Sequence, residues 1–342
     1  MSWYTYTSLA ISAIAVTGNG FLTWLITTRC ALHNTSNWFI ASVSVSDLLV
    51  GLFIAPVSAA CYKLNTCDNH LESVFGELFL YQSIFNLCAM TLDRYLAIVH
   101  PLKYPRFMTA AVAVWTISIS WGIPLVNFGL HFVWLYAGAS TREKWLRIFT
   151  IAEAIFMVTI PSLLLLVANA QIVRVARLQA KKIVAQLRVQ EINFDKMEGA
   201  SASPNVPSEN LDMVALNHQS DKERASIVFQ GKPLSKSSSL ETKSNSRKRL
   251  QRGRFQKSSA KVIIAVVTIF LICWSLSLYA SFCRYLRLCN VSLTAGRLSM
   301  LLIILNSAIN PVVFILFKND IRAETMAISI RRLGQRRSTN ES

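Results

Sequence analysis

Charged residues are scarce in this chain of 342 residues, because Asp, Glu, Lys and Arg together make up only 15% of it. Hydrophobic residues make up 53%, and the mean hydropathy is +0.40. A soluble domain of this length needs more charge to cover its surface. The composition therefore excludes a soluble globular protein and indicates a membrane protein.

Several sequence signatures are also missing. The chain has no zinc-ligand spacing, no Walker loop and no nucleophile elbow, so we expect neither an enzyme nor a catalytic site. It shows no internal repeat of the kind found in transporters and channels, which makes that class the weaker alternative. The first apolar stretch lacks a basic segment before it and is too long for a cleavable signal peptide, so we expect it to act as a signal anchor.

Long apolar stretches, in contrast, are abundant. About 20 apolar residues are needed to cross a membrane as a helix. A window of that length finds seven candidate spans, near residues 5–28, 38–62, 72–99, 109–130, 147–176, 260–284 and 293–317. The expected fold is therefore all-α, a bundle of seven transmembrane helices in a multi-pass membrane protein.

The net charge of +17 is concentrated on one side of this expected topology. The basic residues on that side are Arg29, Lys103, Arg106, Arg174, Arg177, Lys181, Lys182, Arg247, Lys248, Arg249, Arg252, Arg254, Arg331, Arg332, Arg336 and Arg337. By the positive-inside rule that side is cytosolic, which places the N-terminus outside and the C-terminus inside. Such a surface favours anionic membrane lipid and an acidic cytosolic partner, not nucleic acid.

Changes in composition divide the chain into four parts. Residues 1–179 hold the first five spans, and residues 258–318 hold the last two. Residues 180–257 between them are polar and lack hydrophobic periodicity, so we expect a long third cytosolic loop, largely disordered. Residues 319–342 are expected to form a short amphipathic helix and a basic cytosolic tail.

The third span ends on Asp93-Arg94-Tyr95, and Pro101-Leu102 follows shortly after. Charges at the end of a membrane helix cost little at the water interface, so a solvated helix end would explain Asp93 and Arg94 by themselves. The complete run resembles the rhodopsin-like (class A) G-protein-coupled receptors, in which Asp-Arg-Tyr ends the third helix and Pro-Leu follows in the second intracellular loop. The resemblance covers all seven spans, and the local sequence is most similar to that of the biogenic-amine, trace-amine and adenosine receptors.

This resemblance implies a plasma-membrane receptor that transmits binding of an extracellular small-molecule ligand to a cytosolic heterotrimeric G protein. Asp93, Arg94, Tyr95 and Leu102 are then the residues expected to couple to the G protein. Arrestin and receptor kinases are further implied partners. The alternative is a receptor-fold protein without a diffusible ligand, either constitutively active or acting in heteromers.

Asp47 lies in the middle of the second span, where an ionisable residue is a functional-site hypothesis by default. The resemblance implies that Asp47 ligates a sodium ion, with water, and that Asn19 meets Asp47. The other implied members of this network are Ser83, Asn306, Ser307 and Asn310. Such an oxygen-rich set suits a hard cation. No other cofactor or metal is expected.

The resemblance also implies an activation switch within the bundle. Its members are Ile84, Pro161, Phe270, Trp274, Pro311 and Phe314. The carbonyl freed by Pro161 is expected to let the fifth helix bulge. The chain departs from the family pattern where Leu276 replaces a proline and where Asn169 and Phe314 replace tyrosines. Gln256 also replaces an acid that pairs with Arg94 in many relatives.

The expected ligand pocket lies toward the outer ends of the helices and comprises Gly76, Glu77, Leu80, Glu153 and Ser277. Gly76 stands where amine receptors carry the aspartate that holds the ammonium, so we do not expect an amine to bind in the usual way. Glu77 has two readings: it binds a cation in the pocket, or it faces the lipid interface.

Cysteine is absent between Val126 and Arg147, so the disulfide usual in the family cannot form there. Two cysteine pairs with equal spacing occur elsewhere, Cys61 with Cys67 and Cys283 with Cys289. On an oxidising outer side these would form two local bridges, or they remain free thiols.

Overall fold

The computed structural model describes residues 3–64, 69–135, 145, 148–201, 260–283 and 289–340. All regular secondary structure within these residues is helical. The chain divides into two compact units, one formed by Met1–Ala176 with Arg254–Ser342 and the other by Arg177–Gly253. Cys67 and residues 202–259, which include Gln256 and most of the polar segment, lie outside the described residues.

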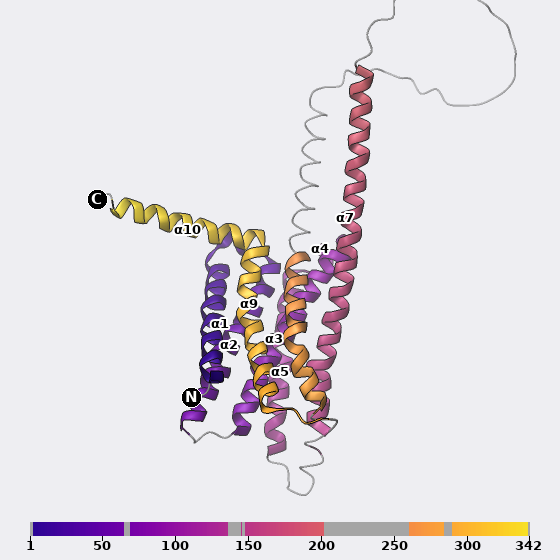
Figure 1. The fold of residues 1–342 in the computed structure, drawn as a ribbon. Helices are drawn as coiled ribbons and strands as arrows, with labels where there is room; N and C mark the ends of the chain where they lie inside the picture. Colours follow the sequence, from indigo (N-terminus) through magenta and orange to yellow (C-terminus); the bar gives the residue numbers. More distant parts are fainter. Residues whose placement is uncertain are drawn as a thin grey trace, which may run out of the picture. The chain divides into compact units, whose positions relative to one another are not determined.

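The first unit is a bundle of long helices (Figure 1). Its helices are α1 (Trp3–Thr28), α2 (Thr35–Leu64), α3 (Asn69–Val99), α5 (Ala110–Leu135), the part up to Ala176 of the segment Ile148–Lys182, the helix Ala260–Cys283, and α9 (Leu293–Phe317). The segment Ile148–Lys182 includes the start of α7 (Ile160–Ser201), whose later part belongs to the second unit. Six of these helices are long and apolar enough to cross a membrane. α3 is equally long but falls short in hydropathy, because polar residues such as Gln82, Asn86 and Arg94 interrupt its apolar surface. The seven helices form the expected all-α bundle.

Three shorter or more polar helices follow the ends of the spans. η1 (Cys30–Leu32) and α4 (Tyr104–Phe107) lie in the turns after α1 and α3. α10 (Asn319–Asn340) follows α9 and turns sideways from it (Figure 1). The break between them is Lys318, whose extended backbone (φ −97°, ψ 110°) ends α9, and Ile321 then anchors α10 because its side chain is completely buried.

Small residues allow α1 to approach α2 and α9, with both of which it is in contact. A Cβ added to Gly51 of α2 would lie 3.0 Å from Val16 Cγ2 and 3.1 Å from the carbonyl oxygen of Ser12. A Cβ added to Gly18 of α1 would lie 3.1 Å from Pro311 Cγ on α9. Such close backbone approach is typical of membrane helices, whose association depends on packing and not on exclusion from water.

The fifth spanning helix bulges where the sequence predicts it. The π-helix η2 (Ala154–Thr159) immediately precedes the turn that contains Pro161. Proline has no N–H to continue the helical hydrogen-bond ladder, so the preceding turn widens. The bulge begins directly after Glu153.

The structure departs from one expectation about the polar segments and adds detail to another. Residues 180–201, expected to begin a largely disordered loop, are helical as the second half of α7. They are rich in strong helix formers, contain no proline, and have their first glycine at Gly199, so local propensity extends the helix past the end of the apolar run. The helix after α9 was expected to be short, but α10 has 22 residues.

Candidate functional site

Asp47 of α2 joins three helices through its side chain. Its Oδ1 accepts hydrogen bonds from Ser83 Oγ of α3 at 2.7 Å and from Ser307 Oγ of α9 at 2.8 Å. Its Oδ2 accepts a hydrogen bond from Asn310 Nδ2 of α9 at 2.6 Å. All four side chains are buried. A carboxylate removed from water requires such donors, so the polar core holds α2, α3 and α9 in one register.

Asn19 of α1 reaches this core through Ser307. Its Nδ2 donates to the carbonyl oxygens of Ser307 and Ala15, each at 2.9 Å. Ser307 therefore lies between Asn19 and Asp47: its hydroxyl faces Asp47, and its carbonyl oxygen faces α1. The membership of Asn19 in a sodium and water network with Asp47 stays a prediction, and Ser307 is the residue that both of them contact.

Three buried amide oxygens in the same core have no hydrogen-bond partner among the residues that the structure describes. They are the Oδ1 atoms of Asn19, Asn306 and Asn310. A buried acceptor without a partner is costly and is normally satisfied by ordered water or by an ion. Together with Asp47 they form an oxygen-rich donor set, which fits a hydrated sodium ion chemically.

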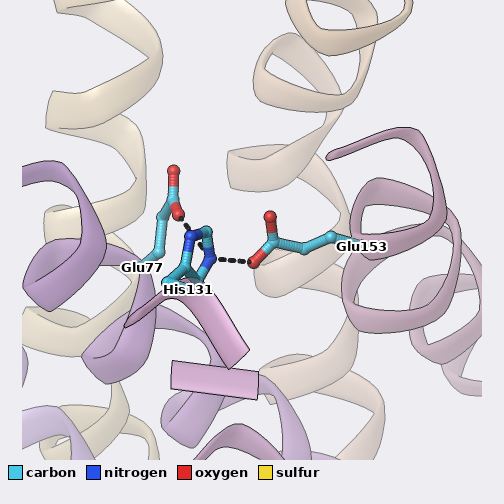
Figure 2. A group of neighbouring side chains, drawn as sticks. All are labelled: Glu77, His131 and Glu153. Atoms are coloured by element: carbon cyan, nitrogen blue, oxygen red, sulfur yellow. Dashed lines mark hydrogen bonds and ion pairs between the residues drawn. The ribbon is translucent and has the colours of Figure 1, made fainter. Parts of the chain in front are cut away.

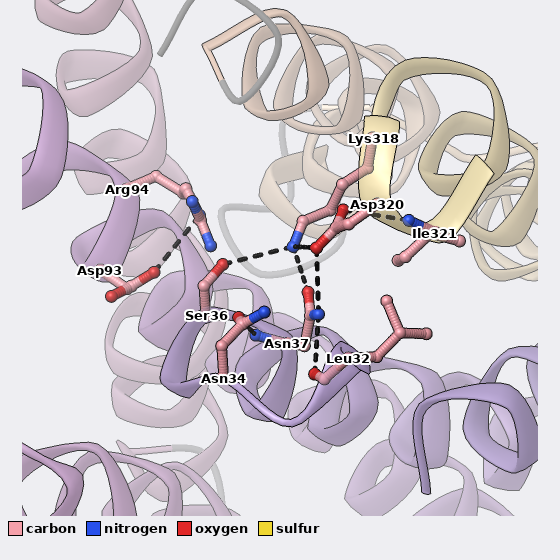
Figure 3. Close-up of polar contacts among 9 residues, drawn as sticks. All are labelled: Leu32, Asn34, Ser36, Asn37, Asp93, Arg94, Lys318, Asp320 and Ile321. Atoms are coloured by element: carbon pink, nitrogen blue, oxygen red, sulfur yellow. Dashed lines mark hydrogen bonds and ion pairs between the residues drawn. The ribbon is translucent and has the colours of Figure 1, made fainter. Parts of the chain in front are cut away.

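Near the C-terminal end of α3, Arg94 forms an ion pair with its chain neighbour Asp93, with Nε and Oδ2 3.3 Å apart (Figure 3). Both side chains are buried. The Nη2 atom of Arg94 is also buried and has no hydrogen-bond partner within the described part of the chain. Tyr95 Oη donates to Gln171 Oε1 of α7 at 2.8 Å, and Leu102 is 95% exposed. This end of the bundle is called the Arg94 end below.

A second charged group at the Arg94 end was not found from the sequence. Lys318, Asp320 and Asn37 form what we call the junction cluster, between α9, α10 and the start of α2 (Figure 3). Lys318 Nζ lies 3.3 Å from Asp320 Oδ2 and donates to Asn37 Oδ1. Asn37 Nδ2 donates to the same Asp320 oxygen at 3.1 Å and to the carbonyl oxygen of Leu32 at 2.8 Å. The cluster fixes the position of α10.

Burial changes the acid–base behaviour of this cluster. It lowers the pKa of Lys318 to about 8, and the nearby positive charge of Arg94 acts in the same direction. Burial alone would raise the pKa of Asp320, but the charge of Lys318 and the hydrogen bond from Asn37 outweigh it and lower that pKa. No sequence motif indicated the cluster, because its members are polar residues at helix ends, where such residues are common.

The expected switch residues lie together in the apolar core. Ile84, Phe270, Trp274 and Phe314 belong to one cluster of buried side chains, and the rings of Phe270 and Trp274 stack with centroids 5.5 Å apart. Pro161 and Pro311 are also buried. Asn169, which replaces a tyrosine of the family, donates from Nδ2 to Thr268 Oγ1 at 3.3 Å. It therefore connects α7 to the helix Ala260–Cys283.

The expected pocket residues lie toward the end opposite Arg94, and their role as a ligand pocket stays a prediction. A Cβ added to Gly76 would meet nothing within 4 Å, Leu80 is buried, and Ser277 is half-buried. A groove of about 490 Å³ does lie on α5 and η2, yet none of the five expected residues lines it. A cavity of about 230 Å³ lies near the Arg94 end and is lined by Leu96, His100, Lys103, Tyr104 and Phe107.

Glu77 and Glu153 both lie close to His131, which was not among the residues expected in the ligand pocket (Figure 2). His131 Nε2 lies 3.0 Å from Glu153 Oε1 and 3.7 Å from Glu77 Oε2. Asn127 Nδ2 donates to the same Glu153 oxygen at 2.6 Å. The signal was available, since Asn127 and His131 are two polar residues four positions apart in an apolar span and so lie on one helix face.

The cysteines near this end are oxidised where the structure describes them. Cys283 and Cys289 form a disulfide with Cα atoms 4.9 Å apart. Cys61 is also disulfide-bonded, and Cys67, the partner that its spacing suggests, lies outside the described residues. Cys30, Cys88 and Cys273 are free thiols.

Comparison with known proteins assigns this arrangement to a family. Residues 18–314 match the family model described as 7 transmembrane receptor (rhodopsin family). The chain is similar to trace amine-associated receptor 8b of Rattus norvegicus, with 30% identity over 197 residues that cover 50% of this chain and 55% of that protein. It is similar to trace amine-associated receptor 7a of Mus musculus, with 30% identity over 192 residues that cover 50% and 53%.

A shorter match of 35% identity over 134 residues links it to trace amine-associated receptor 7c of Rattus norvegicus and covers 38% of this chain and 37% of that protein. The chain thus spans about half the length, or less, of the curated relatives it matches. The family model, however, covers most of the chain and includes all the helices that meet at Asp47. The chain belongs to the rhodopsin family of seven-transmembrane receptors.

Proposed function

We propose that this chain is a plasma-membrane receptor that transmits binding of an extracellular small molecule to a cytosolic heterotrimeric G protein. The observation that carries this proposal is the state of Arg94. It is a buried guanidinium whose ion pair is with its own neighbour in α3 and whose Nη2 has no partner within the described part of the chain. The basic residues near the Arg94 end support a cytosolic location for it by the positive-inside rule.

An arginine in this state suits an incoming helix C-terminus. The guanidinium keeps its charge at any physiological pH and offers several donors in a fixed fork. The last carbonyl groups of a helix lack intrahelical partners and carry partial negative charge. Leu102, exposed nearby, adds an apolar contact for the same partner. Arrestin and receptor kinases are proposed to use this face as well.

The Asp47 core provides a route by which the two ends influence each other. It connects α2, α3 and α9, and α3 carries both Glu77 and Arg94. A sodium ion at Asp47 would favour the arrangement in which Ser83, Ser307 and Asn310 all face the carboxylate. The ion shifts the equilibrium between this arrangement and any other only by the difference between its affinities for the two.

The ligand is proposed to enter at the end opposite Arg94, near Gly76, Glu77, Leu80, Glu153 and Ser277. The relatives are named as trace amine-associated receptors, but a different mode of binding is expected here. Gly76 carries no carboxylate, and the carboxylates of Glu77 and Glu153 already face His131. An ammonium group would have to displace that histidine.

Ligand-free guanine-nucleotide exchange tests the proposal. The full chain would be expressed with heterotrimeric G proteins of each class, and exchange would be compared at equal surface expression with cAMP and calcium as second readouts. Arg94→Ala is expected to lower exchange at least about tenfold. The matched control is Arg297→Ala, which removes a guanidinium that lies over the Tyr4 ring at the opposite end, and it should retain exchange.

Exchange by Arg94→Ala at the wild-type level would contradict the proposal, and so would a wild type that exchanges nucleotide with no G protein whether or not extracellular small molecules are added. The alternative of a receptor without a diffusible ligand makes a different forecast. Nucleotide exchange by the wild-type chain would then already be at its maximal rate in defined medium without ligand, and no added compound would raise that rate.

A further inference from the structure

We propose that Glu77, His131 and Glu153 form a binding site for a divalent transition-metal ion of the Zn²⁺ class at the end of the bundle opposite Arg94 (Figure 2). The three ligands come from three separate helical segments, with Glu77 on α3, His131 on α5 and Glu153 on the turn before η2. A bound ion would therefore link three helices. Metal binding at this site does not depend on a G protein or on an organic ligand.

The distances suit a tetrahedral ion. One ligand atom from each side chain can be chosen so that all three lie within 4.8 Å of one another. Zn²⁺ bonds of roughly 2.0–2.2 Å at tetrahedral angles place neighbouring ligand atoms about 3.4 Å apart. The separations from His131 Nε2, 3.0 Å to Glu153 and 3.7 Å to Glu77, lie on either side of that value. Small side-chain rotations would bring the atoms into position.

The types of ligand atom select the class of ion. An imidazole nitrogen with two carboxylate oxygens suits Zn²⁺ and the neighbouring first-row metals. Ca²⁺ and Mg²⁺ prefer six or more oxygen ligands and seldom accept a histidine. A neutral imidazole and two carboxylates carry a charge of −2, which a divalent ion neutralises. That neutralisation matters in a helix bundle, where an uncompensated charge is costly.

The surroundings orient the ligands and leave an approach path. Asn127 Nδ2 donates to Glu153 Oε1 at 2.6 Å, and the ring of Phe149 packs edge-on against His131 with centroids 5.1 Å apart. Such outer contacts hold ligands in place and contribute to affinity in known metal sites. His131 and Glu153 are buried, whereas the Glu77 side chain is 37% exposed, so an ion can enter from the side of Glu77.

The same contacts also fit a simpler structure, in which a protonated His131 forms ion pairs with both glutamates. The two differ at one atom. In the ion-paired form Nε2 carries a proton toward the carboxylates, and in the metal-bound form the ion replaces that proton. Only the second form binds Zn²⁺ with defined stoichiometry.

The experiment uses the purified full chain in lipid nanodiscs, with an affinity tag free of histidine. Zn²⁺ affinity is measured by competition with a chelating dye, and Co²⁺ is used as a second probe for the visible absorption of tetrahedral coordination. The site variants are Glu77→Gln, His131→Ala and Glu153→Gln. The matched controls are Glu72→Gln, on the same helix as Glu77, and His33→Ala, which removes an exposed histidine from the turn after α1.

One Zn²⁺ per chain is expected in the wild type, with affinity lowered at least about tenfold in each site variant and unchanged in both controls. Zn²⁺ should raise the Tm of the wild type but not that of Glu77→Gln. This variant is decisive if the two buried ones fail to fold, because its side chain is partly exposed and the substitution keeps its shape. Equal Zn²⁺ binding by the wild type and Glu77→Gln, or no tetrahedral Co²⁺ spectrum, would overturn the proposal. Neither result bears on coupling to a G protein.

Discussion

Tyr104 Oη donates a hydrogen bond to Asp93 Oδ1 at 2.7 Å and so ties α4 to the end of α3. The second oxygen of the same carboxylate faces Arg94. Burial and the neighbouring Asp93 charge raise the pKa of Tyr104 well above its usual range, so the phenol keeps its proton and remains a donor. The Asp93 carboxylate thus contacts both α4, through Tyr104, and Arg94, the residue proposed to couple to the G protein.

We expect Asp93→Asn to raise ligand-free nucleotide exchange. The substitution keeps an acceptor for Tyr104 but removes the charge that holds Arg94, which makes the guanidinium available to a partner. The expected rise is at least about twofold, which corresponds to a population shift of only about 0.4 kcal/mol. Tyr104→Phe is the matched control, because it removes the hydrogen bond and leaves the ion pair. Unchanged exchange in Asp93→Asn at equal surface expression would argue against this role of the pair.

We expect Asp47→Asn to remove the effect of sodium. In the wild type, replacing K⁺ by Na⁺ at constant ionic strength should raise the Tm and lower ligand-free exchange, because the ion favours one arrangement of the polar core. An amide at this position supplies one neutral oxygen and lacks the charge that attracts the ion. Asp320→Asn, an aspartate outside this core, should keep the response. A sodium response that survives in Asp47→Asn would place the ion elsewhere.

The junction cluster makes the stability of the bundle depend on pH through Lys318. Its pKa in the folded protein, about 8, is below the ordinary value of 10.5. Between these values the unfolded chain holds a proton that the folded chain has released, so this residue makes stability increase as the pH rises. Below about pH 8 the buried charge is present in full and its contribution is unfavourable.

Thermal unfolding from about pH 7.5 to about pH 11.5 checks this prediction. The wild type should gain Tm with pH relative to Lys318→Met, which cannot titrate, and the difference should level off near pH 10.5. Asp320 acts in another range: its lowered pKa contributes stability that is present at neutral pH and is lost only in acid. Parallel Tm curves for the two proteins would show that Lys318 keeps its ordinary pKa.

Gly51→Ala should destabilise the bundle. The new methyl group would press on Val16, Ala15 and the backbone of Ser12, all within 3.1 Å, and would push α1 away from α2. Overpacking of this kind costs about 1–3 kcal/mol. Gly122→Ala on α5 is the matched control, since its added Cβ meets nothing within 4 Å. A fall in Tm for Gly51→Ala but not for Gly122→Ala is the expected result, and equal Tm values would contradict it.

Much of this architecture follows from local properties of the sequence. Each membrane span is recognisable because a helix in lipid must be apolar along its own length and must satisfy its own backbone hydrogen bonds. The bulge before Pro161 is equally local, since a proline affects the turn that precedes it. Asp47, Ser83, Ser307 and Asn310 were expected to meet because the resemblance to the receptor family implies it, and the structure brings all four together.

Tertiary structure decided how polar side chains from different helices pair. Asn19 donates to the carbonyl oxygen of Ser307 on another helix, and Lys318 at the end of α9 donates to Asn37 near the start of α2. The sequence alone did not indicate a role for His131, because only the packing of α3 against α5 brings Glu77 close to it. The sequence by itself determined the number, length and polarity of the helices, because those depend on residues close in the chain. The rotation of each helix and its depth in the bundle depend on contacts between residues far apart in the chain. Rotation and depth together determine which residues each buried charge contacts.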